Sequence, residues 1–148
     1  MKALIVASLS LLSSSLAFAL SPAMEKQFVD TYKKAYEAKD EKTLNGLLYT
    51  KGADPQALEF FKMMMTADMG GKITSIELVN LDADDKKKAS EVMKGPGGKD
   101  MKLTLPAVKK LVIKTESKDS NGSSSGSSST FVGEADGKLW IDTPGPAK

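Results

Sequence analysis

The hydrophobic periodicity of the sequence changes at Gly70-Gly71, and this change constrains the fold more than any other feature. Before the two glycines, apolar residues recur at spacings of three and four, which predicts amphipathic helices. After them, stretches rich in β-branched and aliphatic residues predict strands. Helices followed by strands along one chain favour an α+β fold, with N-terminal helices packed on an antiparallel sheet of four to five strands.

Three helices are expected before Gly70. Ser21 suits an N-cap, and Pro22 suits the first helical position because its missing N–H would be unpaired there anyway. The apolar stripe of this helix consists of Phe28, Val29, Tyr32, Ala35 and Tyr36. Asp40 predicts the cap of a short second helix. Asp54, which precedes a proline, predicts the start of a third helix that ends at the two glycines.

Five strands are expected after the glycines. Their ranges are 72–81, 103–105, 108–115, 130–134 and 138–143. The Asp136-Gly137 pair between the last two is typical of a hairpin turn. Two loop inserts interrupt the strands. Residues 82–100 are polar and lysine-rich, with a helical turn expected near residues 89–93, and residues 118–129 are glycine- and serine-rich, which predicts a loop or the tip of a mobile hairpin.

Residues 1–19 have the pattern of a secretory signal peptide. Lys2 gives a positive start, an apolar run follows, and Ala17-Phe18-Ala19 has the small residues of a cleavage site. We expect cleavage between Ala19 and Leu20, which leaves a single α+β domain over residues 20–148; an uncleaved anchor is the alternative. The protein is then exported, either periplasmic or secreted. No membrane contact is expected after cleavage, because no later stretch is apolar enough to span a bilayer.

The charge of the chain argues against a nucleic-acid partner. Removing Lys2 from the 21 basic residues leaves 20 against 19 acidic residues, a net charge of +1. A dedicated nucleic-acid binder is expected to be strongly basic. Every basic residue is also a lysine, so the chain lacks the arginine fork that binds phosphate and guanine through two hydrogen bonds.

The chain contains no histidine and no cysteine. It therefore lacks an imidazole base, a thiolate nucleophile and the commonest zinc ligands. Asp82, Asp84 and Asp85 are spaced as at the start of a calcium loop, but Lys87 stands where that loop requires glycine. We expect no metal, no cofactor and no catalytic residue.

A ligand site is expected on the apolar faces of the helices. The third helix contains three consecutive methionines, at 63–65, and its apolar residues predict burial on several faces. These methionines either fill the core or line an adaptable pocket, because methionine is flexible and polarizable. The residues predicted to bind a ligand are Tyr32, Tyr36, Phe61, Met64, Met65 and Trp140. Trp140 is the sole tryptophan, and its indole N–H requires a partner when buried.

Three segments carry a family resemblance: YKKAYEAKDEKTLNGLLY at 32–49, KITSIELVNL at 72–81 and FVGEADGKLWID at 131–142. With the order of elements, they resemble the nuclear-transport-factor-two-like superfamily, the cone-shaped, cystatin-like α+β fold shared with steroid isomerases and polyketide cyclases. The resemblance implies a curved sheet wrapped around a helix, often with an apolar pocket and often as a homodimer. It implies no activity, since this fold hosts enzymes, binders and scaffolds. The catalytic aspartate and tyrosine of the isomerases match no motif here, and both inserts depart from the compact members.

Three functions fit these expectations. The first is an exported, non-enzymatic module that binds a small apolar ligand or a partner protein. The second is a structural or oligomerising domain that uses its sheet face. The third is an isomerase- or cyclase-like enzyme, which needs a buried carboxylate beside a tyrosine in one cavity. Asp30 is close in sequence to Tyr32 and Tyr36 but lies off the apolar stripe, which favours a solvated aspartate.

Overall fold

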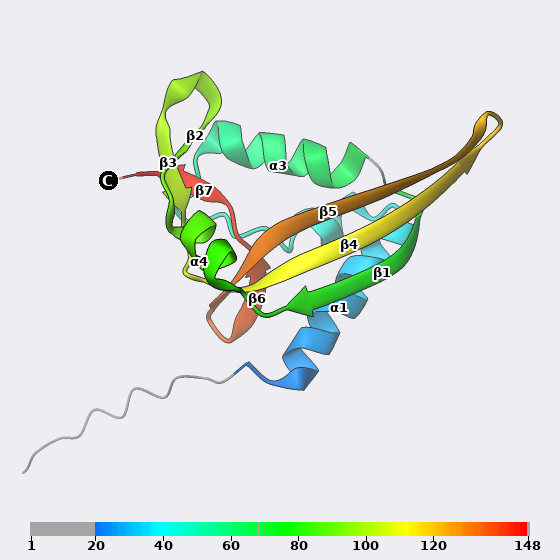
Figure 1. Cartoon of the computed structure of the whole chain (residues 1–148), viewed down its shortest axis with the longest axis horizontal. Helices are drawn as coiled ribbons and strands as arrows, with labels where there is room; N and C mark the ends of the chain where they lie inside the picture. Colours follow the sequence, from blue (N-terminus) through cyan, green and yellow to red (C-terminus); the bar gives the residue numbers. More distant parts are fainter. Residues whose placement is uncertain (1–19, 68, 148) are drawn as a thin grey trace, which may run out of the picture.

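A computed structural model describes residues 20–67 and 69–147 (Figure 1). The predicted signal peptide, including Ala19 of its cleavage site, lies outside the described residues, and Leu20 is the first residue described. In the part of the chain that the structure describes, no helix is both long and apolar enough to cross a membrane.

The described residues form helices and strands in the predicted order. The helices are α1 (Pro22–Glu37), α2 (Glu41–Asn45), α3 (Pro55–Ala67), α4 (Ala83–Ser90) and a 3-10 turn, η1 (Pro96–Gly98). The strands are β1 (Lys72–Val79), β2 (Met93–Lys94), β3 (Asp100–Leu103), β4 (Ala107–Asp119), β5 (Gly122–Ala135), β6 (Lys138–Ile141) and β7 (Pro144–Pro146). The α+β class is therefore confirmed.

The strands form two antiparallel sheets instead of the one that was expected. The larger has the order β1-β4-β5-β6 and the smaller has the order β2-β3-β7. The sheets separate because the chain leaves the larger sheet after Ile141, and Pro144–Pro146 pairs with β3. In Figure 1, α3 runs beside β5, and the hairpin of β4 and β5 projects away from the helices.

One hydrophobic core joins the helices to the larger sheet. The stripe on α1 buries Phe28, Tyr32, Ala35 and Tyr36, as the sequence predicts. The sheet contributes Ile73, Leu111, Ile113, Val132, Leu139 and Ile141 to the same cluster, and Leu44 and Leu48 close one end of it. Leu44 of α2 is a fully buried member of this core, whereas α3 contributes only partly buried residues to it, among them Phe61 and Met65.

The predicted helix caps are confirmed. The Ser21 hydroxyl accepts a hydrogen bond from Met24 N at 3.2 Å, which satisfies a backbone donor that the first helical turn leaves unpaired. Asp40 Oδ1 accepts one from Thr43 N at 3.0 Å at the start of α2. Asp54 caps α3 in the same way, and its backbone N–H donates to the Pro144 carbonyl at 3.0 Å, which ties this helix start to β7.

Both predicted loop inserts contain regular structure. Residues 82–100 hold α4, β2 and η1, and α4 starts well before the helical turn expected near residues 89–93. Of the two alternatives for residues 118–129, the structure contains the hairpin: β4 and β5 continue through these residues and turn at Ser120-Asn121. The intrinsic preference of serine and glycine for strands is weak, but β4 is a continuous partner, and its backbone hydrogen bonds determine the conformation of β5.

Candidate ligand-binding groove

A groove of about 490 Å³ lies between α1, α3 and the inner face of the larger sheet. Five of the six residues predicted to bind a ligand line it together: Tyr32, Tyr36, Phe61, Met64 and Met65. They come from α1 and α3, which are separated in the sequence by α2 and a loop. The floor is formed by the sheet, where Ile113 and Thr130 line the groove.

Trp140 does not line this groove. It lies on β6, beside a separate hollow of about 400 Å³ that Met24, Phe28 and Leu139 also line. Its Nε1 donates a hydrogen bond to the Ala135 carbonyl at 3.0 Å, so the expected partner of the indole N–H is present. Leu139 and Ile141, its neighbours on β6, are buried in the core, and Ile141 lines the groove, so the alternation of side chains along the strand directs Trp140 away from the groove.

The two tyrosines on α1 form the inner end of the groove. Their rings are stacked, with centroids 6.2 Å apart and planes inclined by 16°. Burial, with a smaller contribution from the neighbouring Tyr36, raises the pKa of Tyr32 to about 12. The Tyr32 phenol therefore stays protonated at physiological pH, and it offers a ring face and a neutral hydroxyl instead of a charge.

Helix α3 is less buried than the sequence predicts. Only Ala57 is fully buried on it, whereas Phe60, Met63 and Met64 are 48%, 61% and 51% exposed. The expectation that this helix is buried on several faces is wrong, because α1 already occupies the centre of the sheet and α3 packs beside it along one side. For Met63 and Met64, the interpretation as ordinary core residues therefore fails.

The opposite wall of the groove consists of β5 residues for which the sequence predicts a loop or the tip of a mobile hairpin. Gly126, Ser127, Ser128 and Ser129 line it. These residues lie on an edge of the sheet, because β6 pairs only with residues 132–135 of β5. Nothing in the composition distinguishes these serines from a linker, so no sequence signal marks their role.

Three carboxylates are buried among the described residues, and none of them lines the groove. Asp142 is almost completely buried, and its Oδ1 accepts hydrogen bonds from Leu105 N and Thr104 Oγ1, both at 3.1 Å. Its Oδ2 has no hydrogen-bond partner within the described structure. Burial raises the pKa of this carboxyl group. Asp142 lines a smaller cavity of about 200 Å³ that adjoins the groove at Phe61 and Thr130, and no tyrosine lines that cavity.

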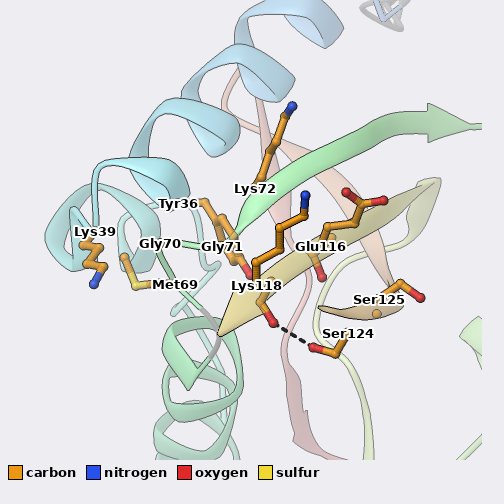
Figure 2. A pocket seen from close by; sticks show the side chains of 13 residues that line it. Tyr36, Lys39, Met69, Gly70, Gly71, Lys72, Glu116, Lys118, Ser124 and Ser125 are labelled. Carbon is orange, nitrogen blue, oxygen red and sulfur yellow. Dashed lines mark hydrogen bonds between the residues drawn. The ribbon is translucent and has the colours of Figure 1, made fainter. Parts of the chain in front are cut away.

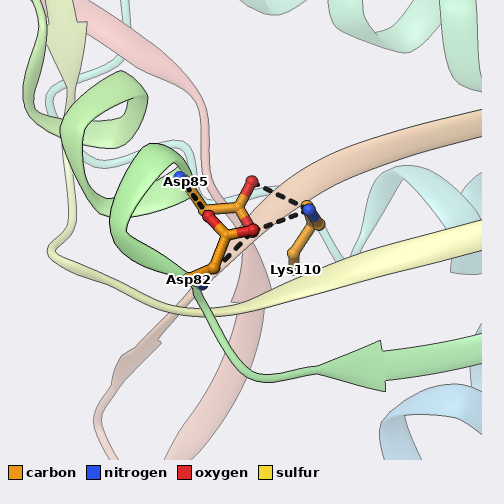
Figure 3. Close-up of polar contacts among 3 residues, drawn as sticks. All are labelled: Asp82, Asp85 and Lys110. Carbon is orange, nitrogen blue, oxygen red and sulfur yellow. Dashed lines mark hydrogen bonds and ion pairs between the residues drawn. The ribbon is translucent and has the colours of Figure 1, made fainter.

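The aspartates that resemble a calcium loop have structural roles. Asp82 and Asp85 cap α4 reciprocally, with Asp85 N donating to Asp82 Oδ1 at 2.7 Å. Both carboxylate oxygens of Asp85 accept hydrogen bonds from Lys110 Nζ, at 2.8 and 2.7 Å (Figure 3). This contact lowers the pKa of Asp85 and raises that of Lys110. No cluster of acidic residues that could hold a metal ion occurs in the described part of the chain.

Comparison with known proteins does not place the chain in a family. No protein-family model matches it, and no curated protein is significantly similar to it. The arguments about function therefore rest on the groove itself.

Proposed function

We propose that this protein is an exported, non-enzymatic module that binds a small apolar ligand in the groove between α3 and the larger sheet. The observation that carries the proposal is the convergence of Tyr32, Tyr36, Phe61, Met64 and Met65 on one groove. The proposal includes cleavage of the signal peptide and the relationship to the nuclear-transport-factor-two-like fold. The α+β class and the position of α1 on an antiparallel sheet support that relationship.

The groove has the size and chemistry that small ligands need. Ligand pockets commonly have volumes of about 300–1,000 Å³ and are lined mainly by apolar and aromatic side chains with a few polar groups. The flexible methionines on α3 can adapt to ligands of different shape. Tyrosines line the groove, but no carboxylate does, which favours binding over the isomerase-like hypothesis.

Fluorescence titration with the neutral apolar probe N-phenyl-1-naphthylamine tests this proposal. Met64→Glu places a carboxylate in the groove, and we expect the probe to bind at least tenfold more weakly, a loss of about 1.4 kcal/mol. Met63→Glu is the matched control, since Met63 lies on the same exposed helix but does not line the groove. Equal affinities of the two variants, or no binding by the unmodified protein, would contradict the proposal.

Oligomerisation through α3 is the second candidate function. Phe60 and Met63 leave an apolar surface on this helix, and none of the large exposed apolar residues that the structure describes lies in the larger sheet. An interface on α3 is thus better supported than one on the sheet face. If the protein is a homodimer through α3, Met63→Glu converts it to a monomer in light scattering while probe binding is retained.

A further inference from the structure

The wall that β5 gives to the groove is an edge of the larger sheet. Five consecutive residues, 126–130, line the groove. Side chains alternate between the two faces of a strand, so consecutive residues line one groove only where the strand turns its edge, and therefore its backbone, toward it. This edge is uncovered because β6 pairs only with residues 132–135, and residues 122–129 are exposed. The groove thus offers backbone hydrogen-bonding groups as well as apolar side chains.

The strand register shows which backbone groups are free. Along an antiparallel strand, alternate residues direct their N–H and C=O groups to opposite neighbours. Phe131 directs its carbonyl away from β4, because this oxygen accepts a hydrogen bond from Asp142 N at 3.0 Å. Every second residue before it, Ser129, Ser127 and Ser125, has the same orientation, since the pairing with β4 has no register shift here. On that side of these serines, no other strand of the described chain pairs with them.

The two edges of the larger sheet differ in their protection. Edge strands in native proteins usually resist pairing with other chains through charged side chains, prolines or bulges. β1, at the opposite edge, carries Lys72 and Glu77 and has a register shift between Ile73 and Ser75. Residues 122–129 of β5 are all serines and glycines, with no register shift. This edge therefore lacks the usual obstacles to the addition of one more strand.

A strand added beside β5 would lie between this edge and α3. The other side of the groove is formed by apolar side chains of α3: Phe61, Met64 and Met65. Gly126 and Ser128 share a face with Thr115 and Ile113, the residues paired with them, and this face forms the floor of the groove. Residues of an added strand opposite Gly126 and Ser128 therefore enter the groove, and the residues between them face outward. The site thus suits a chain with apolar side chains at alternate positions.

The outer face of the sheet beside this edge carries a net positive charge. Lys114 lies directly across from Ser127, and Glu116 and Lys118 follow on the same face; Figure 2 shows the last two extending to the same side. Neither lysine forms an ion pair within the described residues. An acidic residue opposite Ser127 on an added strand would lie about 10 Å from Lys114, two strand spacings, which the two long side chains span. A second copy of β5 would bring another Lys114 and no acidic residue to this place, so charge disfavours self-pairing.

We propose that β5 binds an extended segment of a partner protein as an additional strand. Apolar side chains at alternate positions of the segment enter the groove, and an acidic residue between them faces Lys114. The inference rests on the proposed function, because the same groove receives the apolar groups, and it specifies the partner. The added contacts are hydrogen bonds to the backbone of Ser125, Ser127 and Ser129. In this mode of recognition, backbone hydrogen bonds give affinity and side-chain pockets give specificity.

Fluorescence anisotropy with the labelled, C-terminally amidated peptide SFEVEFS tests the inference on the full chain. We expect the peptide to bind and to displace N-phenyl-1-naphthylamine. Two isomers, N-methylated either on both glutamates or on both phenylalanines, each block one edge of the peptide. Only one edge can pair with β5, so we expect one isomer to bind at least tenfold more weakly and the other to retain its affinity. Lysine in place of both glutamates is expected to weaken binding at low salt.

Ser127→Pro tests the same hydrogen bonds from the protein side. Proline removes an N–H that points away from β4, and edge strands tolerate proline at such positions. We expect the peptide to bind this variant at least tenfold more weakly. Ser123→Pro is the matched control, since its N–H also points away from β4 but it does not line the groove. Circular dichroism checks the fold of both variants, and the N-methylated isomers test the bonds in the unmodified protein.

Each outcome identifies what fails. Equal binding of the two N-methylated isomers, while the naphthylamine probe binds, overturns strand addition and leaves the apolar groove standing. If neither the peptide nor the probe binds, the proposed function fails as well. Peptide binding without displacement of the probe, or equal binding to the two proline variants, places the peptide elsewhere and overturns the inference. Unchanged binding of the lysine peptide overturns the acidic residue. A dimer that only Ser127→Pro converts to a monomer in light scattering makes a second copy the occupant and overturns the partner segment.

Discussion

At the scale of single residues, Asp142 makes stability depend on pH in an unusual direction. Burial raises the pKa of this carboxyl group in the folded protein above its ordinary value of 3.8. The folded state therefore binds the proton more tightly than the unfolded state, and protonated Asp142 adds to the free energy of unfolding. This added stability is present below about pH 3.8 and is lost as pH rises through the raised pKa. Above that pKa, the charged carboxylate destabilises the fold.

Asp142→Asn tests this effect. The asparagine Oδ1 can still accept the hydrogen bonds from Leu105 N and Thr104 Oγ1, but its side chain does not ionise. We expect the free energy of unfolding of the variant, relative to the unmodified protein, to increase with pH across this window. Urea unfolding at several pH values measures it, and a constant difference would show that the buried carboxyl group does not titrate differently in the two states.

Gly145 lies at a position where a side chain does not fit. A Cβ atom there would lie 2.2 Å from the carbonyl oxygen of Gly52, which belongs to the backbone and cannot rotate away. We expect Gly145→Ala to lower the free energy of unfolding by about 1–3 kcal/mol through forced backbone displacement. Urea unfolding again measures the change, and an unaltered midpoint and slope would mean that β7 adjusts freely.

At the scale of elements, the start of α3 depends on Asp54. Its Oδ1 accepts hydrogen bonds from Gln56 N and Ala57 N, at 2.9 and 3.1 Å. We expect Asp54→Ala to cost about 0.5–2 kcal/mol of stability, the usual range for loss of an N-cap. Asp54→Ser keeps a capping oxygen and is expected to retain most of it. If serine is as destabilising as alanine in urea unfolding, the ion pair with Lys99 or packing, and not the cap, is responsible.

The elements also show what the sequence could predict. The stripe on α1, the caps at Ser21, Asp40 and Asp54, and the turn at Asp136-Gly137 are local signals, and the structure contains all of them. The strand predicted at 130–134 is only the end of β5, and the length of β5 was missed because residues 122–129 depend on pairing with β4, which local composition does not encode. The exposure of α3 was missed because apolar periodicity does not reveal how many helices share one sheet face.

The same distinction applies to the candidate site. Tyr32, Tyr36, Phe61, Met64 and Met65 were selected by residue type on two helices, and the structure brings these five to one groove. Trp140 was also selected by residue type but lies elsewhere, because side chains alternate along β6: Ile141 lines the groove and Trp140 points to the other face. The wall formed by residues 126–129 depends on the pairing of β5 with β4 and on the position of α3, so no sequence motif marks it.

At the scale of the whole molecule, the hydrophobic core that joins the helices to the larger sheet predicts a single cooperative unfolding transition. Leu111 is fully buried at the centre of the cluster that joins α1, α2 and the larger sheet. We expect Leu111→Ala to cost about 2–5 kcal/mol, with equal shifts of the midpoint measured by circular dichroism and by Trp140 fluorescence. Ser125→Ala in the exposed hairpin is the control and should change neither. Separate midpoints for the two probes would show that the helices and the sheet unfold independently.

The far end of the β4–β5 hairpin lies outside that core. The pairing of β1 with β4 stops at Glu116, so the pairs Ser117–Ser124, Lys118–Ser123 and Asp119–Gly122 form a ribbon of only two strands. Two-stranded ribbons in water are marginally stable, and we expect amide hydrogen exchange at Ser123 and Ser125 to be much faster than at Leu111. Gly126 and Ser127 follow this ribbon and line the groove, so, with a ligand bound as proposed, transient opening of the ribbon gives a route for ligand exchange that leaves the rest of the fold intact.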